Sequence, residues 1–116
     1  MFDFLKRKEI DKKMNTHHLD EVIVDAIINP LREFVKYQKE HGYHLPKDFE
    51  ISPTSWLITL EQILFAFEQK QIEQKGWENK VTKNMTSEQL AENRKIVQKG
   101  FELFGKYFQD LYEVDN

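Results

Sequence analysis

Apolar residues recur at three- and four-residue intervals along most of the chain, which is the period of an amphipathic helix. No stretch of β-branched residues alternates with polar residues over the length of a strand. The pattern therefore predicts an all-α fold. We expect a compact bundle of three main helices, at about 16–41, 53–75 and 87–114, in one domain of residues 16–116. Residues 1–15 form a separate basic amphipathic segment, which we expect to contain a short helix.

The first predicted helix begins at Thr16, a residue type that caps helix N-termini, and ends before Gly42. Pro30 lies inside this helix. Because the proline ring clashes with the carbonyl group of Ala26, we expect a kink or a break at residues 28–29. The apolar stripe expected to face the core consists of Val22, Ile23, Ala26, Ile27, Leu31, Phe34 and Val35.

The second helix has clear start and stop signals. Ser52 is a capping residue followed by Pro53 at the first helical position, and Gly76 ends the pattern. Its stripe consists of Trp56, Leu57, Leu60, Ile63, Leu64 and Phe67. The preceding residues 42–52 are predicted to form an ordered loop. We expect three of its apolar side chains to plug the end of the bundle: Leu45, Phe49 and Ile51.

The third helix begins at Thr86 or Ser87, since Thr86 and Gln89 have the spacing of a capping box. One apolar seam contains Leu90, Val97, Phe101, Phe104, Phe108 and Leu111. A flanking row contains Ile96, Gly100, Leu103 and Tyr107.

Two glycines lie inside this third helix, where each costs roughly 1 kcal/mol relative to alanine. Gly100 falls in the apolar flank, so its missing side chain is expected to let another helix approach closely. The alternative is a ligand that contacts the Gly100 backbone. Gly105 faces another direction, where it permits a bend or leaves room for Tyr112 or a partner.

Composition limits the classes of function. The net charge is -3 and the pI is about 5.8, so we expect no nucleic-acid binding, which depends on neutralising phosphates. The absence of cysteine excludes disulfides and thiolate chemistry and fits a reducing cytoplasm. No apolar run approaches the roughly 20 residues of a membrane span, so none is expected.

The segment 1–15 is basic within this acidic chain. It carries five Lys or Arg against three Asp or Glu, a sum of +2, so the remaining residues sum to -5. Phe2, Leu5 and Ile10 fit one face of a short amphipathic helix. Docking onto the bundle, contact with a partner and adsorption to an anionic membrane all remain open for this segment.

No set of residues suggests catalysis or a bound metal or cofactor. His17 and His18 diverge on a helix, and His41 and His44 bracket a turn, so we expect surface or capping roles for all four histidines. Helical pyrophosphohydrolases hold magnesium with repeated pairs of acids three residues apart, whereas this chain has one such pair, Asp110 and Glu113. Its serines occupy cap-like positions, and it has no glycine-rich phosphate loop. We therefore expect no enzyme.

Three separated motifs carry a resemblance to a known family: "NPLREFVKYQKEHGYHLP", "SPTSWLITLEQILFAFE" and "GFELFGKYFQDLYE". Together they look like a family of small, mostly uncharacterised proteins encoded by tailed bacteriophages. The match covers roughly residues 28–68 and 99–113. His44 and Tyr112 depart from the pattern, which more often has proline and tryptophan at those positions. The resemblance implies a viral origin and no established activity.

These observations favour a non-enzymatic binding protein in the cytoplasm of the bacterial host. It would modulate a host protein or counter a bacterial defence system. Trp77 lies in a polar stretch away from any apolar stripe, where it anchors against the bundle or contacts a partner. The candidate partner surface consists of Tyr43, His44, Trp77, Tyr107 and Tyr112. The high aromatic content also suggests a homodimer through the third helix.

Two alternatives belong to other classes of function. In the first, the protein sequesters a small nucleotide signal, with an aromatic side chain for stacking and cations on the phosphates. The candidate phosphate contacts are Lys36, Lys39, Arg94, Lys99 and Lys106. In the second, the protein has a structural or self-assembling role related to the virion.

Overall fold

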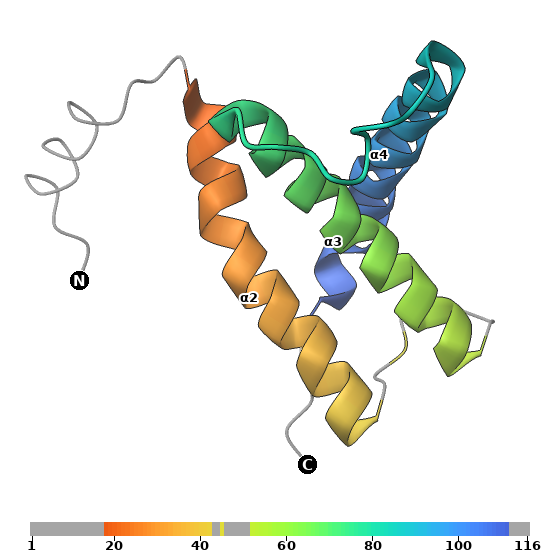
Figure 1. The fold of residues 1–116 in the computed structure, drawn as a ribbon. Helices are drawn as coiled ribbons and strands as arrows, with labels where there is room; N and C mark the ends of the chain where they lie inside the picture. Colours follow the sequence, from red (N-terminus) through yellow and green to blue (C-terminus); the bar gives the residue numbers. More distant parts are fainter. Residues whose placement is uncertain (1–17, 43–44, 46–51, 112–116) are drawn as a thin grey trace, which may run out of the picture.

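Three long helices pack against one another, with the second of them in the centre (Figure 1). The computed structural model describes residues 18–42, 45 and 52–111. The elements are α2 (Leu19–His41), α3 (Pro53–Lys75), α4 (Ser87–Tyr107) and a 3-10 turn, η2 (Phe108–Asp110). Helix α3 contacts both α2 and α4, and the described residues contain no strand. The prediction of an all-α bundle of three main helices is confirmed, whereas segment 1–15 lies outside the described residues.

Helix α2 begins later than the sequence predicted. Its first residue is Leu19, and His18 precedes it without forming a side-chain cap hydrogen bond. The predicted cap, Thr16, lies outside the described residues. Asp20 and Glu21 place negative charge in the first turn, where they interact favourably with the helix dipole. At the other end the helix stops before Gly42, as predicted.

Pro30 does not break α2, which continues through it as one helix (Figure 1). The proline removes the amide that would bond to the carbonyl of Ala26. Ala26 and Pro30 are both exposed, so water can satisfy that carbonyl. On the opposite side, the buried Ile28 and Leu31 hold the helix against α3 on either side of the proline.

The core-facing side of α2 differs from the predicted stripe. Leu31 and Val35 are buried as expected, but the other buried positions are Val24, Ile28 and Gln38. Ile23 and Ala26, which were expected in the core, are exposed. The apolar residues of α2 extend over a wide arc of the helix surface, and α3 packs against only part of it. This part lies to one side of the predicted stripe.

Helix α3 begins and ends at the residues that the sequence predicted. The backbone N–H of Ser55 donates to the Ser52 side chain at 3.3 Å, and Pro53 is the first helical residue. Gly76 ends the helix in the left-handed region at φ 67°. Its N–H donates to the carbonyl of Glu73 (3.3 Å) and that of Trp77 to the carbonyl of Ile72 (3.1 Å), the two bonds of a Schellman motif. The predicted core stripe is confirmed.

Helix α4 starts with the predicted capping box. The Gln89 N–H donates to Oγ1 of Thr86 (3.2 Å), and the Thr86 N–H donates to Oε1 of Gln89 (2.9 Å). The α-helix ends at Tyr107 rather than near residue 114, because the chain tightens into η2 there. At this point Tyr107 leaves the helical region (φ -108°, ψ 13°) with its ring packed edge-on against Trp56.

The core consists of two clusters along α3. The first joins Ile63 and Phe67 of α3 to α2, and the Phe67 ring meets Phe101 and Phe104 of α4 edge-on, at centroid distances of 5.1 and 4.9 Å. The second surrounds Trp56 and Leu60, which are fully buried; Leu45 packs against it, as predicted. Two residues expected in the seam and flank of α4, Ile96 and Phe108, are instead exposed.

At Gly100 the helices α3 and α4 approach each other closely. A Cβ atom at this position would lie 2.5 Å from the Cβ of Ala66 and 2.5 Å from the carbonyl oxygen of Gln62. The packing interpretation of Gly100 is therefore confirmed. At Gly105 an added Cβ would meet nothing within 4 Å, and α4 continues through this residue.

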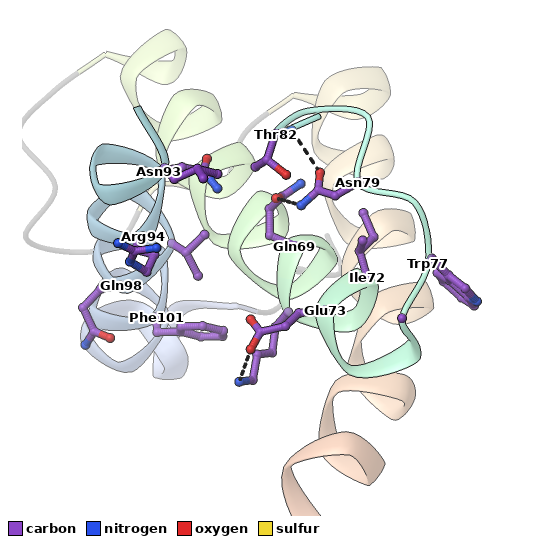
Figure 2. Close-up of a pocket in the computed structure, with 14 residues that line it drawn as sticks. Gln69, Ile72, Glu73, Trp77, Asn79, Thr82, Asn93, Arg94, Gln98 and Phe101 are labelled. Atoms are coloured by element: carbon purple, nitrogen blue, oxygen red, sulfur yellow. Dashed lines mark hydrogen bonds and ion pairs between the residues drawn. The ribbon is translucent and has the colours of Figure 1, made fainter. Parts of the chain in front are cut away.

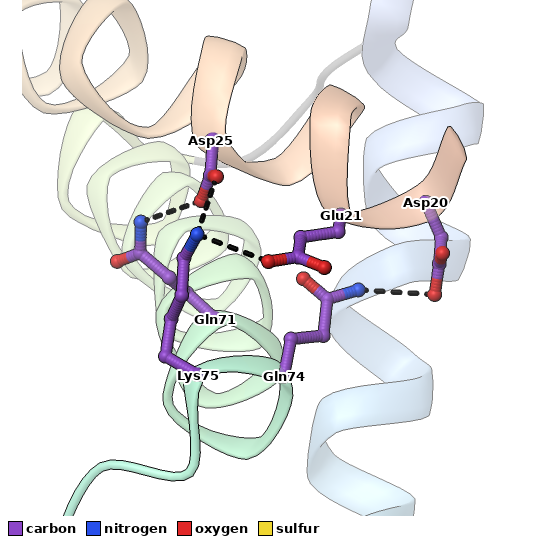
Figure 3. A network of polar contacts seen from close by, with 6 residues as sticks. All are labelled: Asp20, Glu21, Asp25, Gln71, Gln74 and Lys75. Atoms are coloured by element: carbon purple, nitrogen blue, oxygen red, sulfur yellow. Dashed lines mark hydrogen bonds and ion pairs between the residues drawn. The ribbon is translucent and has the colours of Figure 1, made fainter. Parts of the chain in front are cut away.

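A polar network joins the beginning of α2 to the end of α3 (Figure 3). The Lys75 ammonium group donates to Asp25 at 2.8 Å and to Glu21 at 3.0 Å. Gln71 donates to the other carboxylate oxygen of Asp25 at 3.1 Å. The hydrogen bond from Lys75 lowers the pKa of Asp25 below its usual value, and Asp25 in turn raises the pKa of Lys75.

Lys75→Met is expected to reduce stability at neutral pH and to have little effect in strong acid. The folded pKa of Asp25 is lowered, so its contribution is present above about pH 4 and is lost as the pH falls through the folded pKa. The raised pKa of Lys75 preserves the pair until strongly alkaline pH. Melting midpoints between pH 2 and pH 9 would test this, with Lys83→Met, in an exposed pair with Glu78, as the control. An equal loss for Lys75→Met at pH 2 and pH 7 would contradict it.

Candidate functional site

A cleft of about 650 Å³ lies between the second half of α3, the connection 77–86 and α4 (Figure 2). Its walls combine apolar and polar side chains. Ile72, Leu90, Val97 and Phe101 supply apolar surface, while Gln69, Asn79, Asn93, Arg94 and Gln98 supply hydrogen-bonding groups. Such a mixture is typical of a recognition surface, where apolar contact supplies affinity and a few polar groups fix orientation.

The connection that forms one wall is held to α3 by Asn79. Its side-chain oxygen accepts the backbone N–H groups of Val81 (3.1 Å) and Thr82 (3.3 Å), which makes an Asx-type turn. Its side-chain nitrogen donates to the oxygen of Gln69 at 2.8 Å. Gln69 is buried, so the hydrogen bond from Asn79 satisfies an acceptor that burial removes from water. The Asn79–Gln69 hydrogen bond thus holds this wall of the cleft to α3.

The opposite wall is one face of α4. Arg94, Gln98 and Phe101 follow one another at i, i+4 and i+7, so they lie on the same side of the helix. The Phe101 ring is fixed by its contact with Phe67 in the core. Arg94 is exposed and presents its guanidinium group at the rim.

Trp77 occupies the other edge of the cleft, directly after the Schellman turn. It is 56% exposed, although it lines the cleft. Figure 2 shows Trp77 and Arg94 on opposite sides of the cleft, with Gln69 and Glu73 between them and the indole ring directed outward. The indole ring therefore does not face the guanidinium group of Arg94 across the cleft.

The structure separates the residues of the predicted partner surface. Tyr43, His44 and Tyr112 lie outside the described residues. Trp77 follows the C-terminal end of α3, whereas Tyr107 packs against Trp56 in the first turn of that helix. The 23 residues of α3 span roughly 33 Å, so Trp77 and Tyr107 belong to different surfaces.

The five predicted phosphate contacts are not gathered into one site either. Lys36 and Lys39 lie on α2, whereas Arg94, Lys99 and Lys106 lie on α4. Lys39 forms an ion pair with Glu61 at 3.0 Å, and the Lys106 ammonium group lies 5.2 Å from the centroid of the Tyr107 ring. Of the five, only Arg94 is among the residues that line this cleft.

Sequence reasoning missed the amide side chains of the cleft. Gln69 is a polar residue at a buried position of α3, and Asn79 follows the Gly76–Trp77 turn at a distance suited to an Asx turn. Both features are visible in the sequence. Their hydrogen bond to each other depends on the path of the connection, which the spacing does not specify.

Neither a metal centre nor a membrane helix emerges from the part of the chain that the structure describes. Within residues 18–42, 45 and 52–111, no three side chains of His, Cys, Asp or Glu are grouped to hold a metal ion. Of α2, α3 and α4, none is long and apolar enough to cross a membrane. The cleft instead offers hydrogen-bonding, aromatic and cationic groups. The chain matches no protein-family model, no curated protein and no solved structure.

Proposed function

We propose that this protein is a phage-encoded, non-enzymatic binding protein that engages a bacterial host protein through the cleft between α3 and α4. Binding would take place in the host cytoplasm and modulate the host protein or counter a defence system. The observation that carries the proposal is the pairing of an exposed Trp77 at one edge of the cleft with an exposed Arg94 at the other. Tryptophan and arginine are the residue types that most often dominate the binding energy of protein interfaces.

The spread of the surface favours a macromolecular partner. Because Trp77 and Arg94 lie on opposite sides of the cleft, a partner that contacts both must cover the groove between them (Figure 2). Apolar and polar side chains line the groove together, a mixture that is usual for the surface of a non-obligate protein interface.

The surface is also held in place before binding. The Asn79–Gln69 hydrogen bond and the Schellman turn at Gly76 fix the connection that carries Trp77. The capping box at Thr86 fixes the start of the helix that carries Arg94. A preformed surface loses less conformational entropy on binding, so more of the contact energy appears as affinity.

Capture from lysates of bacterial hosts of tailed phages would test this proposal, with tagged protein and mass spectrometry as the readout. We expect one host protein to be retained, and its affinity to fall about 30-fold in Trp77→Ala or Arg94→Ala, which corresponds to a typical hot-spot loss of about 2 kcal/mol. Lys36→Ala, an exposed change on α2, serves as the matched control and should bind normally. Equal retention by all three variants would contradict the use of this cleft, and a blank from every lysate would contradict a host protein partner.

A second candidate function, sequestration of a small nucleotide signal, is favoured by one observation. Arg94, Gln98 and Phe101 share one face of α4 in the cleft, which suits a phosphate and a hydrogen-bonding base. A panel of cyclic and adenylated nucleotides should then raise the melting midpoint of the wild-type protein and leave that of Arg94→Ala unchanged. Flat melting curves across the panel would count against this function.

A further inference from the structure

Within the part of the chain that the structure describes, Arg94 is the charged side chain of the α3–α4 cleft that has no partner. The charged residues that line this cleft are Lys70, Glu73 and Arg94. Lys70 is paired with Glu73, since its ammonium nitrogen lies 3.8 Å from a carboxylate oxygen of Glu73 (Figure 2). Arg94 makes no hydrogen bond or ion pair with any described residue, whereas Arg32 is bonded to Glu68 at 2.7 Å. The cleft therefore contains one guanidinium group whose charge the described residues leave unbalanced.

The part of the chain that surrounds the cleft is basic, although the protein as a whole is acidic. From Gln69, the first residue that lines the cleft, to Phe101, the last, the chain has seven Lys or Arg and four Asp or Glu, a sum of +3. The remaining residues sum to -6, because the net charge of the chain is -3. Even without Lys75, which is bonded to two acids of α2, this segment keeps a positive surplus. Opposite charge thus favours an acidic partner at this cleft.

Apolar side chains lie on both sides of Arg94 along α4. Leu90 precedes Arg94 by four residues, and Val97 and Phe101 follow it by three and seven, so all four share one side of the helix. Val97 and Phe101 lie roughly 10 and 16 Å from Leu90 along the helix axis. In an extended peptide, side chains four residues apart lie on the same face at about 13 Å from each other. A segment with an acid at its centre and an apolar residue two positions away on each side therefore matches this row.

We propose that the segment of the host protein that binds in the α3–α4 cleft is an acidic, apolar peptide with an Asp or Glu carboxylate on Arg94. This inference rests on the proposed function, because it names the kind of segment that the host protein presents. The guanidinium group donates two parallel N–H groups to the carboxylate, a geometry that adds both energy and specificity. The apolar residues on either side of the acid lie against Leu90 at one end and against Val97 and Phe101 at the other.

A single carboxylate suits the charges of the cleft better than a phosphate group does. Glu73 lines the same cleft, and Lys70 is already paired with it. A phosphate monoester carries about 1.5 to 2 negative charges at neutral pH, so it needs more than one cation to balance it. Arg94 supplies one positive charge, which balances the single charge of an Asp or Glu side chain.

Selection from a yeast-displayed library of random short peptides tests this inference with the full-length protein. We expect the enriched peptides to contain Asp or Glu, with apolar residues two positions before and after it. Synthetic copies should bind Arg94→Gln more weakly than the wild-type protein by a factor of about ten or more, because a charged hydrogen-bonded pair is lost. Lys95→Gln is the matched control and should bind normally, since Lys95 is paired with Glu92 at 3.2 Å and does not line the cleft.

Enriched peptides without an acidic residue would overturn the inference, and so would a library from which nothing is enriched. Equal binding of the acidic peptides to the wild-type protein and Arg94→Gln would overturn it as well. Arg94 is exposed, so an unchanged melting midpoint is expected to show that this variant is folded.

The selection uses no bacterial lysate, so its outcome is separate from that of the capture experiment. A host protein retained by a cleft that selects only uncharged peptides would overturn the acidic segment and leave the proposed function standing. Acidic peptides selected by a protein that retains nothing from any lysate would support the chemistry of the cleft and contradict the host partner.

Glu73→Gln should change the binding of the same peptides in the opposite direction. The substitution releases Lys70 and removes a negative charge from the cleft, so acidic peptides should bind about two- to fivefold more tightly. The Glu73 side chain is 74% exposed, and its backbone carbonyl, which accepts the Gly76 N–H, is kept. Unchanged or weaker binding to Glu73→Gln would contradict an acidic occupant.

Discussion

Replacing Gly100 with leucine should lower the free energy of unfolding by about 1–3 kcal/mol, the usual cost of forcing a larger side chain into a packed contact. A Cβ atom at this position would come within 2.5 Å of both the Ala66 Cβ and the Gln62 carbonyl oxygen. One of these is backbone, so α3 and α4 must move apart to relieve the contact. That movement would also loosen the edge-on contacts between Phe67 and the two phenylalanines of α4.

Gly100→Ala tests the same contact with a single methyl group. Alanine favours a helix over glycine by roughly 1 kcal/mol, so helix propensity alone predicts stabilisation. We expect a net loss instead, because the methyl group has no space. Urea unfolding with a fixed m-value would give the difference directly. A gain in stability would show that Gly100 is not at a close helix contact.

The matched control is Gly105→Ala in the same helix. An added Cβ there meets nothing within 4 Å, and Gly105 has no positive φ. Only the helix propensity changes, so stability should rise by about 0.5–1 kcal/mol. A loss of stability in Gly100→Ala together with a gain in Gly105→Ala would show that packing, and not helix propensity, requires glycine at position 100.

The sequence predicted most of α3 and the start of α4 because short-range chemistry determines them. Ser52, Pro53 and Gly76 act within one or two turns, and the Thr86–Gln89 pair closes its own hydrogen bonds. The core stripe of α3 was also predictable. This helix lies between α2 and α4, so the residues of its predicted stripe are covered from one side or the other, whereas Ile58, outside the stripe, is 53% exposed.

The buried side of α2 depended on information that the periodicity does not contain. Its apolar residues occupy a broad arc, and α3 covers only the part that includes Val24, Ile28 and Val35. Ion pairs between the helices, such as those of Lys75 with Asp25 and of Arg32 with Glu68 at 2.7 Å, flank the covered part, and the periodicity of α2 alone does not indicate these long-range contacts. The end of α4 was predicted too late, near residue 114, for the same reason, since Tyr107 leaves the helix where it meets Trp56.

The candidate site was predictable only in part. Trp77 was identified because it interrupts a polar stretch, and Arg94 because it is a cation on a helix. Their placement on two sides of one cleft requires the return path of residues 77–86, which the Asn79–Gln69 hydrogen bond stabilises. Lys36 and Lys39, from the same set of predicted contacts, lie on α2, and α2 contributes nothing to this cleft.

The two tryptophans offer the largest expected contrast in stability. Trp56 is fully buried among Val35, Leu60 and the edge of the Tyr107 ring. Trp56→Ala should therefore lower the free energy of unfolding by about 3–5 kcal/mol, which combines lost apolar transfer with the cavity that remains. A loss of this size approaches the total stability of a small domain, so Trp56→Phe provides a milder variant whose unfolding can be followed.

Trp77→Ala is the matched change at an exposed tryptophan, and it should alter stability by no more than about 0.5 kcal/mol. The Schellman bond at this residue uses its backbone N–H, which alanine keeps. Acrylamide quenching of fluorescence in Trp56→Phe and Trp77→Phe separates the two environments, because the quencher reaches Trp77 and is excluded from Trp56. A large stability loss in Trp77→Ala would show that the indole supports the fold. A small loss would leave that variant folded, so that any binding it loses reports on the cleft itself.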